Sequence, residues 1–582
     1  MKKLYIDLME KIVGAYTTED IKNYIAEVKE KGITEHGFGR LTANIGLLIA
    51  HGKCLDLQEL FVQMMDICCK DIPTTRERFS NKSDDPSSQE TYSKVGNDFC
   101  VRELICCLLA LEENKVFPIE QTTNWRNLLQ KLNPYTCYSV IAKSPSDKVH
   151  NWAAYGAASE QARNFAGIGN SAEFIDTQIG SQIPSFDENG MYRDPNEPMV
   201  YDVTTRLQLT AALFFGYNGT YKEKLDKNLE LGGLNTLFLQ SVTGEIPFGG
   251  RSNQFLHNEA VLAAVCEYEA VRHYKKGRLK LAGHFKHAAK MAVDSIISYL
   301  GSDQLYHIKN RYPKDSFYGC EKYAYYKKYM VTTASFLYLA YLFADDEIVP
   351  ERSSAMEEIF IFETTPYFHK TMCKFGDYFV EYETDADFHY DANGLGRIHK
   401  KGAPSAICLS VPFTTTPNYS LNITNPSNLS ICCGVYDGQD FISSADPGTK
   451  YVLQNKSVTD SKAELEWLLT LPTGIQILET CIVSNEGVHL SYQLHEKDEE
   501  NAEIYCMLPA FESDGAEKTV INVSQQQLQV DYRGHSCNFR TSGEIIDFGK
   551  IFANRNGHYK AFIAQDTQKL EVHITIRSFT HV

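Results

Sequence analysis

The sequence predicts an α+β protein of two domains, in which a block of paired helices is followed by an antiparallel β-sandwich. The chain has 582 residues, which is more than one hydrophobic core usually supports. Apolar residues recur every three or four positions up to about residue 345, and from about residue 365 onward they alternate instead. One helical block before one strand block therefore indicates two domains packed together, residues 1–350 and 351–582.

The helical period runs through most of the first block. Thr17 and Asp20 form a capping pattern that marks the start of an early helix. Several later segments are apolar nearly all round, so we expect other helices to cover them on both sides. The clearest segments are 55–70, 99–114, 124–132, 204–217, 259–274 and 329–346. About a dozen helices with short connections predict two concentric layers, an (α/α) toroid.

One polar stretch in this block, residues 74–98, does not follow the helical period. It is too long and too hydrophilic for a simple connection between helices. We therefore expect it to be either disordered or a lid over a site.

The second block consists of alternating segments joined by Gly, Asn and Asp turns, which predict strands. These segments are 375–384, 405–413, 465–496, 502–511, 519–534 and 569–579. No helical period interrupts them, so the strands are expected to pair antiparallel and to form a sandwich.

The composition excludes some classes of function. With 43% hydrophobic and 23% charged residues, the chain is an ordinary globular protein. Its 74 Asp and Glu residues outnumber its 57 Lys and Arg residues, and the net charge of −17 argues against nucleic-acid binding. An anionic small ligand is not excluded, because a local pocket of Arg, His and Asn can oppose the overall field.

The N-terminus and the cysteines indicate a cytoplasmic protein. Lys2 and Lys3 imitate the start of a signal peptide, but Asp7 and Glu10 interrupt any apolar core, so we expect an amphipathic helix. No uncharged run approaches the roughly 20 apolar residues of a membrane span. The 16 cysteines show no C-x-x-C metal spacing, which favours free, buried thiols in a reducing compartment.

Four segments carry more chemistry than the rest of the helical block, and the first is "HNWAAYGAASEQAR", residues 150–163. His150 and Asn151 open a predicted helix, with Trp152 beside them. The pattern fits either a site at the start of a helix or a simple helix cap with a buried aromatic residue.

The second segment is a turn-rich loop, residues 186–208. It brings Tyr201 and Asp202 to the entrance of a predicted helix that contains Arg206. Loops that hold Tyr, Arg and Asp at a helix entrance are often functional, although polar turns are common.

The third segment is "IPFGGRSNQFLHNEA", residues 246–260. A helix that begins near Ser252 or Asn253 places Asn253 and His257 on one face, with Arg251 just before the first turn. The position four after His257 is valine, so the spacing of a zinc protease is absent. The alternative is a Ser or Asn cap with His257 in the core, but three donors around a glycine turn favour a site.

The fourth segment, residues 318–330, carries Tyr323, Tyr325 and Tyr326 beside three lysines. Tyrosines at helical spacing are more often core residues or platforms for stacking sugars than catalysts.

In the strand block, residues 389–404 place His389, Asp391, Arg397 and His399 in a Gly-rich turn. This turn could hold a metal or reach over the cleft as a hairpin. A solvated loop is the favoured interpretation.

A helical toroid before an antiparallel sandwich, with "HNW" opening one inner helix and a Tyr-bearing loop about 50 residues later, resembles the heparinase II/III-type and alginate-lyase-type polysaccharide lyases. The similarity of architecture spans nearly the whole chain, whereas the motif match is short. Within this group the chain looks most like the branch that acts on uronic acids at chain ends, such as rhamnose–glucuronate lyases.

The resemblance implies β-elimination at a uronic acid. Such enzymes neutralise the carboxylate with Asn, His or Arg donors, a role for Asn151 with Arg251 or Asn253 in support. Tyr and His act as base and acid, and by position these are Tyr201 and His257. Many relatives have a second His directly after the Asn, whereas Trp152 follows here, so the assignment of base and acid stays open.

The resemblance and the four segments together give a set of predicted site residues. The catalytic residues are Asn151, Tyr201 and His257, and the substrate-binding residues are His150, Trp152, Arg206, Arg251, Asn253, Glu259, Tyr325 and His399. No catalytic metal or cofactor is implied, and a structural divalent metal in the sandwich is left open.

Two other classes of function compete with the lyase. A glycoside hydrolase on a related toroid would need paired carboxylates, for which Asp187, Glu188, Asp194, Asp202 and Glu259 are available. A non-catalytic carbohydrate-binding or scaffold protein is the second. Only a lyase product carries a conjugated double bond that absorbs ultraviolet light.

The acidic charge and the expected cytoplasmic location narrow the lyase prediction. A long polyanion prefers a basic groove, so this chain is expected to trim imported uronic-acid-containing oligosaccharides from one end. Residues 74–98 and the 389–399 hairpin could close such a pocket. We expect no nucleic-acid or membrane partner, and a homo-oligomer is left open.

Overall fold

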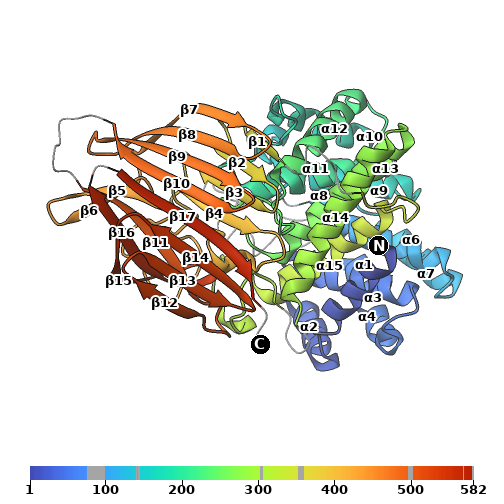
Figure 1. Ribbon diagram of the computed structural model, residues 1–582. Coiled ribbons are helices and arrows are strands. Elements are labelled where there is room, and N and C mark those ends of the chain that lie inside the picture. Colours follow the sequence, from blue (N-terminus) through green and yellow to red (C-terminus); the bar gives the residue numbers. More distant parts are fainter. Residues whose placement is uncertain are drawn as a thin grey trace.

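The computed structural model describes residues 1–74, 99–138, 140–141, 145–301, 306–351, 359–495, 503–567 and 569–579. The α-helices end at Phe343 and the strands begin at Ile359, which confirms the predicted order of a helical block and a strand block (Figure 1). The expected lid, residues 74–98, lies outside the described residues except for Thr74.

The helical block contains short and long α-helices joined by brief turns. They are α1 (Lys2–Val13), α2 (Thr18–Lys31), α3 (His36–Ala50), α4 (Gln58–Asp71), α6 (Val101–Glu113), α7 (Ile119–Leu129), α8 (Pro134–Cys137), α9 (Asn151–Phe165), α10 (Ala172–Gln182), α11 (Met199–Phe214), α12 (Lys222–Leu239), α13 (Leu256–Lys275), α14 (Leu279–Tyr299) and α15 (Tyr326–Phe343). Thr17 caps α2 through a reciprocal pair of bonds with Asp20, as its sequence pattern predicted.

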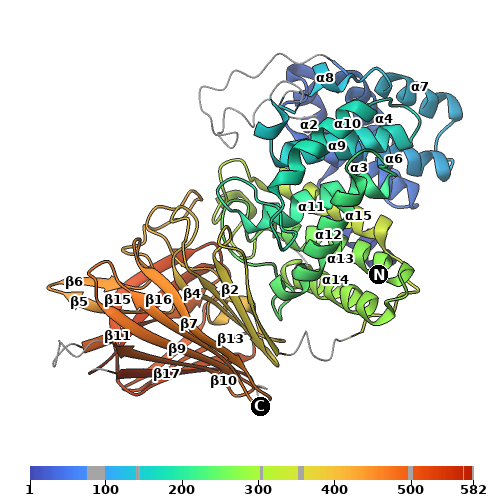
Figure 2. The same cartoon turned by 90° about the horizontal axis from the view of Figure 1, so that it is seen from above.

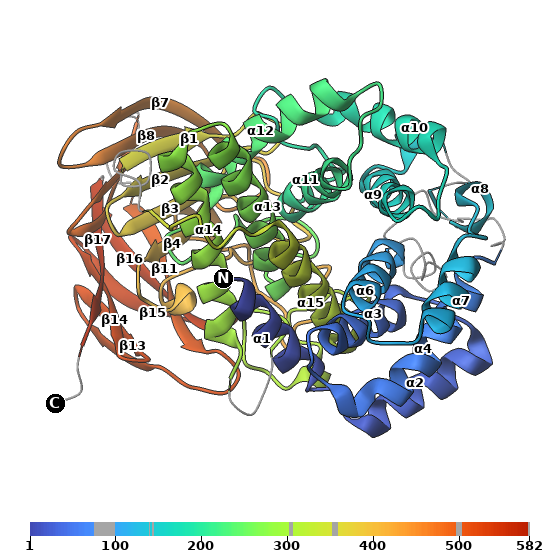
Figure 3. The ribbon, with the colours of Figure 1, turned by 90° about the vertical axis from the view of Figure 1, so that its right-hand side faces the viewer.

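The helices form two concentric layers, which confirms the (α/α) toroid. In the described chain α3, α6, α9, α11, α13 and α15 each contact the next, and α15 contacts α3, so the inner ring is closed (Figure 3). Outer helices back them: α4 on α3, α7 on α6, α10 on α9, α12 on α11, α14 on α13 and α1 on α15. Every residue of α3 is buried because neighbours surround it, whereas α1 buries one face only.

The strand block forms three antiparallel sheets. The strands are β1 (Ile359–Glu363), β2 (Lys370–Phe375), β3 (Tyr378–Glu383), β4 (Gly394–Lys400), β5 (Cys432–Asp437), β6 (Asp440–Ser443), β7 (Lys450–Val458), β8 (Ala463–Thr470), β9 (Gln476–Ser484), β10 (Gly487–Leu494), β11 (Glu503–Ser513), β12 (Val520–Ser524), β13 (Gln527–Tyr532), β14 (His535–Thr541), β15 (Glu544–Asn554), β16 (Gly557–Thr567) and β17 (Lys569–Ser578).

The predicted antiparallel sandwich is confirmed. Its largest sheet has the order β12-β13-β14-β17-β10-β9-β8-β7, a second has β15-β16-β11-β5-β6, and a third has β1-β2-β3-β4. Apolar side chains from all three sheets share one core. Figure 2 shows the sheets layered on one side of the helical ring.

The strand expected at residues 405–413 is wrong. Ser405–Ile407 is a short 3-10 turn, and beyond it Leu409 and Phe413 form only isolated bridges. Pro404 and Pro412 lack the N–H that a central strand needs. The segment is apolar because it is buried, not because it alternates between core and solvent.

Two predictions about the chain as a whole can be compared with the structure. The 16 cysteines, all of which lie in the described residues, form no disulfide, and all but Cys54 are buried, as predicted. Among the helices of the described residues, none combines the length and the apolar character that crossing a membrane requires.

A candidate active site inside the helical ring

The inner ring encloses a narrow cavity of about 50 Å³. Asn151 on α9, Tyr201 on α11 and His257 on α13 all line it, each from a different inner helix. The space suits a few water molecules, or one carboxylate with the carbon that bears it. The other lining residues are His36, Arg40, Phe99, Tyr155, Val200, Thr204, Tyr329, Thr332 and Phe336. The structure therefore brings the three predicted catalytic residues together.

Asn151 is the first residue of α9, and its amide is held in one direction. The preceding His150 has a φ of 46°, which turns the chain sharply into the helix. Asn151 Nδ2 donates to one oxygen of Asp194 at 2.9 Å, and the other oxygen of Asp194 accepts from Arg251. A primary amide has two N–H groups, so the second can donate to a ligand in the cavity.

His257 lies in the first turn of α13 against aromatic rings. Its ring centroid is 5.1 Å from that of Tyr329 and 5.8 Å from that of Phe255. Burial, followed by the positive charge of Arg40, lowers the pKa of His257 to about 3. The imidazole is therefore neutral at physiological pH.

The amide of Asn258 determines which nitrogen of His257 carries the proton. Asn258 Nδ2 lies 3.1 Å from the Ser252 carbonyl oxygen, and because a carbonyl only accepts, this end of the amide is the NH₂ group. The same Nδ2 lies 3.2 Å from His257 Nε2, which must then accept. The single proton of the neutral ring is therefore on Nδ1, which is buried without a hydrogen-bond partner in the described chain.

Tyr201, in the first turn of α11, ends a row of three hydroxyl groups. Its hydroxyl lies 3.3 Å from Ser252 Oγ, which lies 2.9 Å from the Tyr323 hydroxyl. The guanidinium of Arg251 stacks on the Tyr201 ring at 4.3 Å from its centroid. Ser252 can therefore donate a hydrogen bond to the Tyr201 oxygen, while Arg251, itself paired with Asp194, holds the ring in place.

Glycine shapes the turn that presents Arg251 and Ser252. Gly249 and Gly250 have φ values of 114° and 75°, a region that other residues rarely adopt. A Cβ on Gly250 would lie 2.5 Å from the Cα of Pro198. The glycine turn that the sequence indicated is therefore present, although Arg251 and Asn253 do not line the cavity.

The predicted start of the following helix is wrong. α13 begins at Leu256, because Ser252 and Gln254 have φ values of 57° and 68° and cannot belong to a right-handed helix. Asn253 therefore lies in the turn, where its Nδ2 donates to a backbone carbonyl at 3.0 Å. It does not share a helix face with His257, and it does not line the cavity.

A buried arginine that the sequence analysis missed gives the cavity positive charge. Arg40 donates to His36 Nδ1 at 3.0 Å and to Thr332 Oγ1 at 2.7 Å. Arg40 and Arg102 share the one carboxylate of Glu103, at 3.6 and 2.6 Å, so a net positive charge remains. Burial, and then Arg40, hold the pKa of His36 well below its usual value. The available signal was a His and an Arg four positions apart in residues 36–50, a segment that was not among the predicted helices.

Three predicted binding residues border the site without lining the cavity. His150 precedes Asn151. Burial lowers the pKa of His150, although the nearby Asp194 carboxylate opposes this shift. Trp152 packs against Phe99, with ring centroids 4.3 Å apart, and so supports the cavity wall. The third residue, Arg251, holds the Tyr201 ring.

The remaining predicted binding residues are engaged elsewhere. They are Arg206, paired with Asp202 at 2.7 Å; Glu259, paired with Lys309 at 2.8 Å; His399, whose Nε2 lies 2.9 Å from Ser410 Oγ; and Tyr325, which lines a separate surface pocket.

None of the five carboxylates considered for a hydrolase lines the cavity. Asp194 comes nearest and is already bonded to Asn151 and Arg251. Asp187 accepts from Thr365 at 2.8 Å, and Asp202 and Glu259 form the pairs described above.

The prediction of a solvated loop at residues 389–404 is wrong. Residues Gly394–Lys400 form the buried strand β4. Arg397 in this strand donates to the carbonyl of Ile246, which precedes the glycine turn, at 2.7 Å. His389 remains outside, with 60% of its side chain exposed. Among the described residues, no three His, Cys, Asp or Glu side chains are grouped so as to hold a metal ion.

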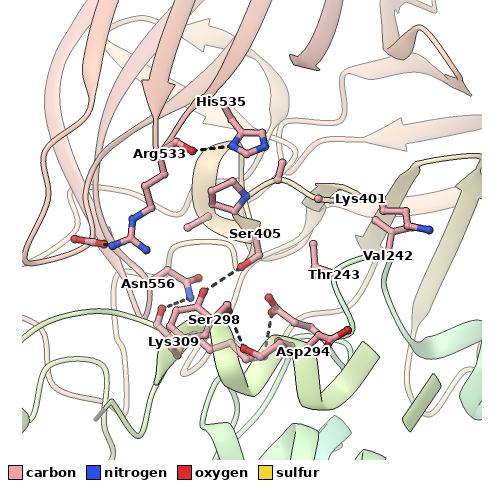
Figure 4. A pocket seen from close by; sticks show the side chains of 18 of the residues that line it. Val242, Thr243, Asp294, Ser298, Lys309, Lys401, Ser405, Arg533, His535 and Asn556 are labelled. Atoms are coloured by element: carbon pink, nitrogen blue, oxygen red, sulfur yellow. Dashed lines mark hydrogen bonds and ion pairs between the residues drawn. The ribbon is translucent and has the colours of Figure 1, made fainter. Parts of the chain in front are cut away.

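A larger cavity of about 510 Å³ lies between α14 and the sandwich (Figure 4). None of the predicted site residues lines it. Charged groups on its walls form pairs, Lys309 with Glu245 at 3.0 Å and Arg311 with Asp514 at 3.3 Å. Because the predicted catalytic residues converge in the ring, we place the candidate active site there.

Comparisons with known proteins add information about the fold. No family model and no curated protein matches the chain. Heparinase III aligns with 93% of this chain and 76% of its own, at 8% identity and a TM-score of 0.48. A heparan sulfate lyase from Pedobacter heparinus covers 93% and 76%, at 9% identity and a TM-score of 0.45. A polysaccharide lyase covers 58% and 96%, at 11% identity and a TM-score of 0.37. Such likenesses concern the fold alone.

Proposed function

We propose that the chain is a lyase that cleaves the glycosidic bond next to a uronic acid by β-elimination. The observation that carries the proposal is the ring cavity, which joins Arg40, Asn151, Tyr201 and His257 and has no Asp or Glu among its described lining residues. β-Elimination needs donors for a carboxylate and a group that moves a proton. Glycoside hydrolases generally need two carboxylates.

The first requirement is neutralisation of the uronate carboxylate, which makes the proton on C5 acidic. Arg40 supplies positive charge, and the second N–H of Asn151 supplies a hydrogen bond. His257 contributes Nδ1–H as a third donor. These groups are fixed before the substrate arrives, so they stabilise the charge that develops on the carboxylate without reorganising.

The second requirement is movement of a proton. His257 Nδ1 already carries one and cannot accept another, so the role of base falls to Tyr201. Tyr201 acts in its ionised form: the phenolate oxygen takes the C5 proton, the electrons of the C5–H bond form the C4–C5 double bond, and the bond from C4 to the glycosidic oxygen breaks. The same hydroxyl then returns the proton to the leaving oxygen. This series of proton transfers uses only side chains of the protein.

We also propose that the substrate is an oligosaccharide cut from one end. The small, ring-enclosed cavity favours a single terminal residue, and a net charge of −17 opposes a long polyanion along the surface. An immediate fall in the viscosity of a long uronate polymer would contradict this part of the proposal.

The test is a screen of uronate-terminated oligosaccharides, read by ultraviolet absorbance. Tyr201→Phe is expected to lower kcat at least 100-fold, because it removes the proton carrier but keeps the ring under Arg251. Tyr274→Phe, at an exposed position on α13, is the matched control. New reducing ends without absorbance would indicate a hydrolase, and ligand binding without any product would indicate a binding protein.

A further inference from the structure

The sandwich reaches into the helical domain through the tip of the β15–β16 hairpin. Arg555 at this tip is buried and donates to both oxygens of Glu321, at 2.7 and 3.0 Å, and to the Gly319 carbonyl at 2.7 Å. Its guanidinium also stacks on Tyr419, 4.2 Å from the ring centroid. Glu321 precedes α15 in the helical domain, so this pair joins the two domains.

Glu321 also contacts the glycine turn. Its Oε1, which accepts from Arg555, also accepts the backbone N–H of Ser252 at 2.6 Å. Ser252 has a left-handed backbone, which costs a non-glycine residue conformational energy and needs surrounding contacts to hold it. The Ser252 side chain then contacts the Tyr201 hydroxyl.

A second residue of the same hairpin tip supports the turn. Asn556 Nδ2 donates to Gln254 Oε1 at 3.2 Å and to the Lys309 carbonyl at 2.9 Å. Gln254 is the other non-glycine residue of the turn with a left-handed backbone. The hairpin therefore contacts the turn at both of its strained positions, directly at one and through Glu321 at the other.

We infer that Arg555, acting through Glu321 and Ser252, is a positioning residue for Tyr201. This inference rests on the proposed function of Tyr201 as proton carrier. It makes the sandwich part of the catalytic apparatus, although no sandwich residue lines the ring cavity in the described chain.

The experiment must separate positioning from folding, because removing one member of a buried ion pair leaves an uncompensated charge. The double variant Arg555→Met with Glu321→Leu replaces the pair by apolar side chains, an exchange that is often neutral for stability. It also removes the acceptor for Ser252 N–H. Arg555→Lys keeps the charge and part of the hydrogen bonding, and is expected to retain intermediate activity.

We expect the double variant to fold with a Tm near that of the native protein and to lose at least tenfold in kcat, with KM changed less than threefold. The matched control is Arg533→Met, a sandwich arginine that is paired with Glu517 and does not line the ring cavity. Hydrogen exchange of peptides covering residues 246–258 should become faster in the double variant only.

A double variant with native kcat and native exchange at 246–258 would overturn the inference. So would equal losses in kcat and in substrate affinity that follow a lowered Tm. If the native protein gives no ultraviolet-absorbing product with any uronate oligosaccharide, the proposed function fails. The exchange measurement still tests the positioning of the turn in that case.

Discussion

At the scale of single residues, the amide of Asn258 sets the chemical role of its neighbour. By donating to His257 Nε2, it leaves His257 with a proton on Nδ1 and makes the ring a donor. Gln at position 257 also offers an N–H group, whereas Ala offers none. We therefore expect His257→Ala to lower kcat/KM by about 100-fold or more and His257→Gln by about tenfold.

Initial rates followed by ultraviolet absorbance give kcat/KM for both variants. If His257 were instead the base, Gln could not replace it, and the two variants would be equally inactive. Equal inactivity with native folding would therefore contradict the donor role.

The low pKa of His257 has a consequence for stability. Its folded pKa of about 3 lies below the usual value near 6.5, so the unfolded chain binds the proton first as pH falls. The contribution of neutral His257 to the free energy of unfolding is complete above about pH 6.5 and is lost as pH falls toward 3. We expect the free energy of unfolding to fall by about 2 kcal/mol more between pH 7 and 5 in the native protein than in His257→Gln.

Urea unfolding at the two pH values measures this difference. His36, whose pKa is also lowered, remains in both proteins and contributes to the pH dependence of each. Identical pH dependence in both proteins would mean that His257 is not protected from protonation in the fold.

The sequence predicted three of the residues that line the ring cavity, but not the positive charge that Arg40 brings to it. Asn151, Tyr201 and His257 each lie where a loop or turn enters a helix, a position that a pattern can reveal. Arg40 lies inside an apolar helix, and only closure of the ring brings it against α15, more than 200 residues further along the chain. Spacing along one helix carries no information about that contact.

At the scale of elements, the glycine turn offers a direct test of local geometry. Gly250 and Gly402 have similar φ values, 75° and 78°, but a Cβ would meet Pro198 only at Gly250 and would enter open space at Gly402. Both Ala variants carry the cost of a left-handed backbone. Gly250→Ala should additionally displace the turn and lower kcat at least tenfold.

Denaturant unfolding and kcat, measured for both variants, separate the two effects. Gly402→Ala should lose about 1 kcal/mol of stability and keep its activity. Full activity in Gly250→Ala would show that the turn does not need its contact with Pro198.

The errors made at this scale share a physical cause. The helix predicted from Ser252 begins later because left-handed residues interrupt it, and polar residues alone do not reveal backbone handedness. The strand predicted at 405–413 is a buried irregular segment, because apolar character reports burial and not hydrogen bonding. Periodicity was reliable where segments were long, as in α13 and α15.

At the scale of the whole molecule, a network of charged side chains, buried at Glu383 and partly exposed at Glu197, joins the two domains. His369, just before β2, bonds Glu383 of β3 and, at 2.8 Å, Glu197 of the helical domain. Burial opposes charge on His369, but the two carboxylates outweigh it and raise its pKa to about 10. The contribution of protonated His369 to the free energy of unfolding is complete below about pH 6.5 and is lost as pH rises toward 10.

We expect the native protein to lose stability between pH 6.5 and 9, by up to about 1.4 kcal/mol per pH unit from this group. His369→Gln should lower stability at pH 6.5 and flatten this slope. Thermal unfolding across the range measures it, with the exposed His389→Gln as control. A slope unchanged in His369→Gln would mean that the network is not charged as described.

The order and class of the domains followed from one change in apolar period, because each period corresponds to one kind of secondary structure. The contact between the domains did not follow. Arg555 and Glu321 are single charged residues separated by more than 200 positions, and nothing in their neighbourhoods marks them as partners. Buried pairs of this kind become visible only in three dimensions.

The closed ring also constrains how the protein can be made. α1, which is synthesised before the other described helices of the block, packs on α15, the last of them, and α3 contacts α15 as well. Contacts this distant in sequence form late, because a long loop must close before they can stabilise anything. Until residue 343 has emerged, the nascent chain lacks the wall that faces Arg40. Synthesis must therefore complete the helical block before the closed ring cavity can form. A chain truncated before α15 would lack this cavity.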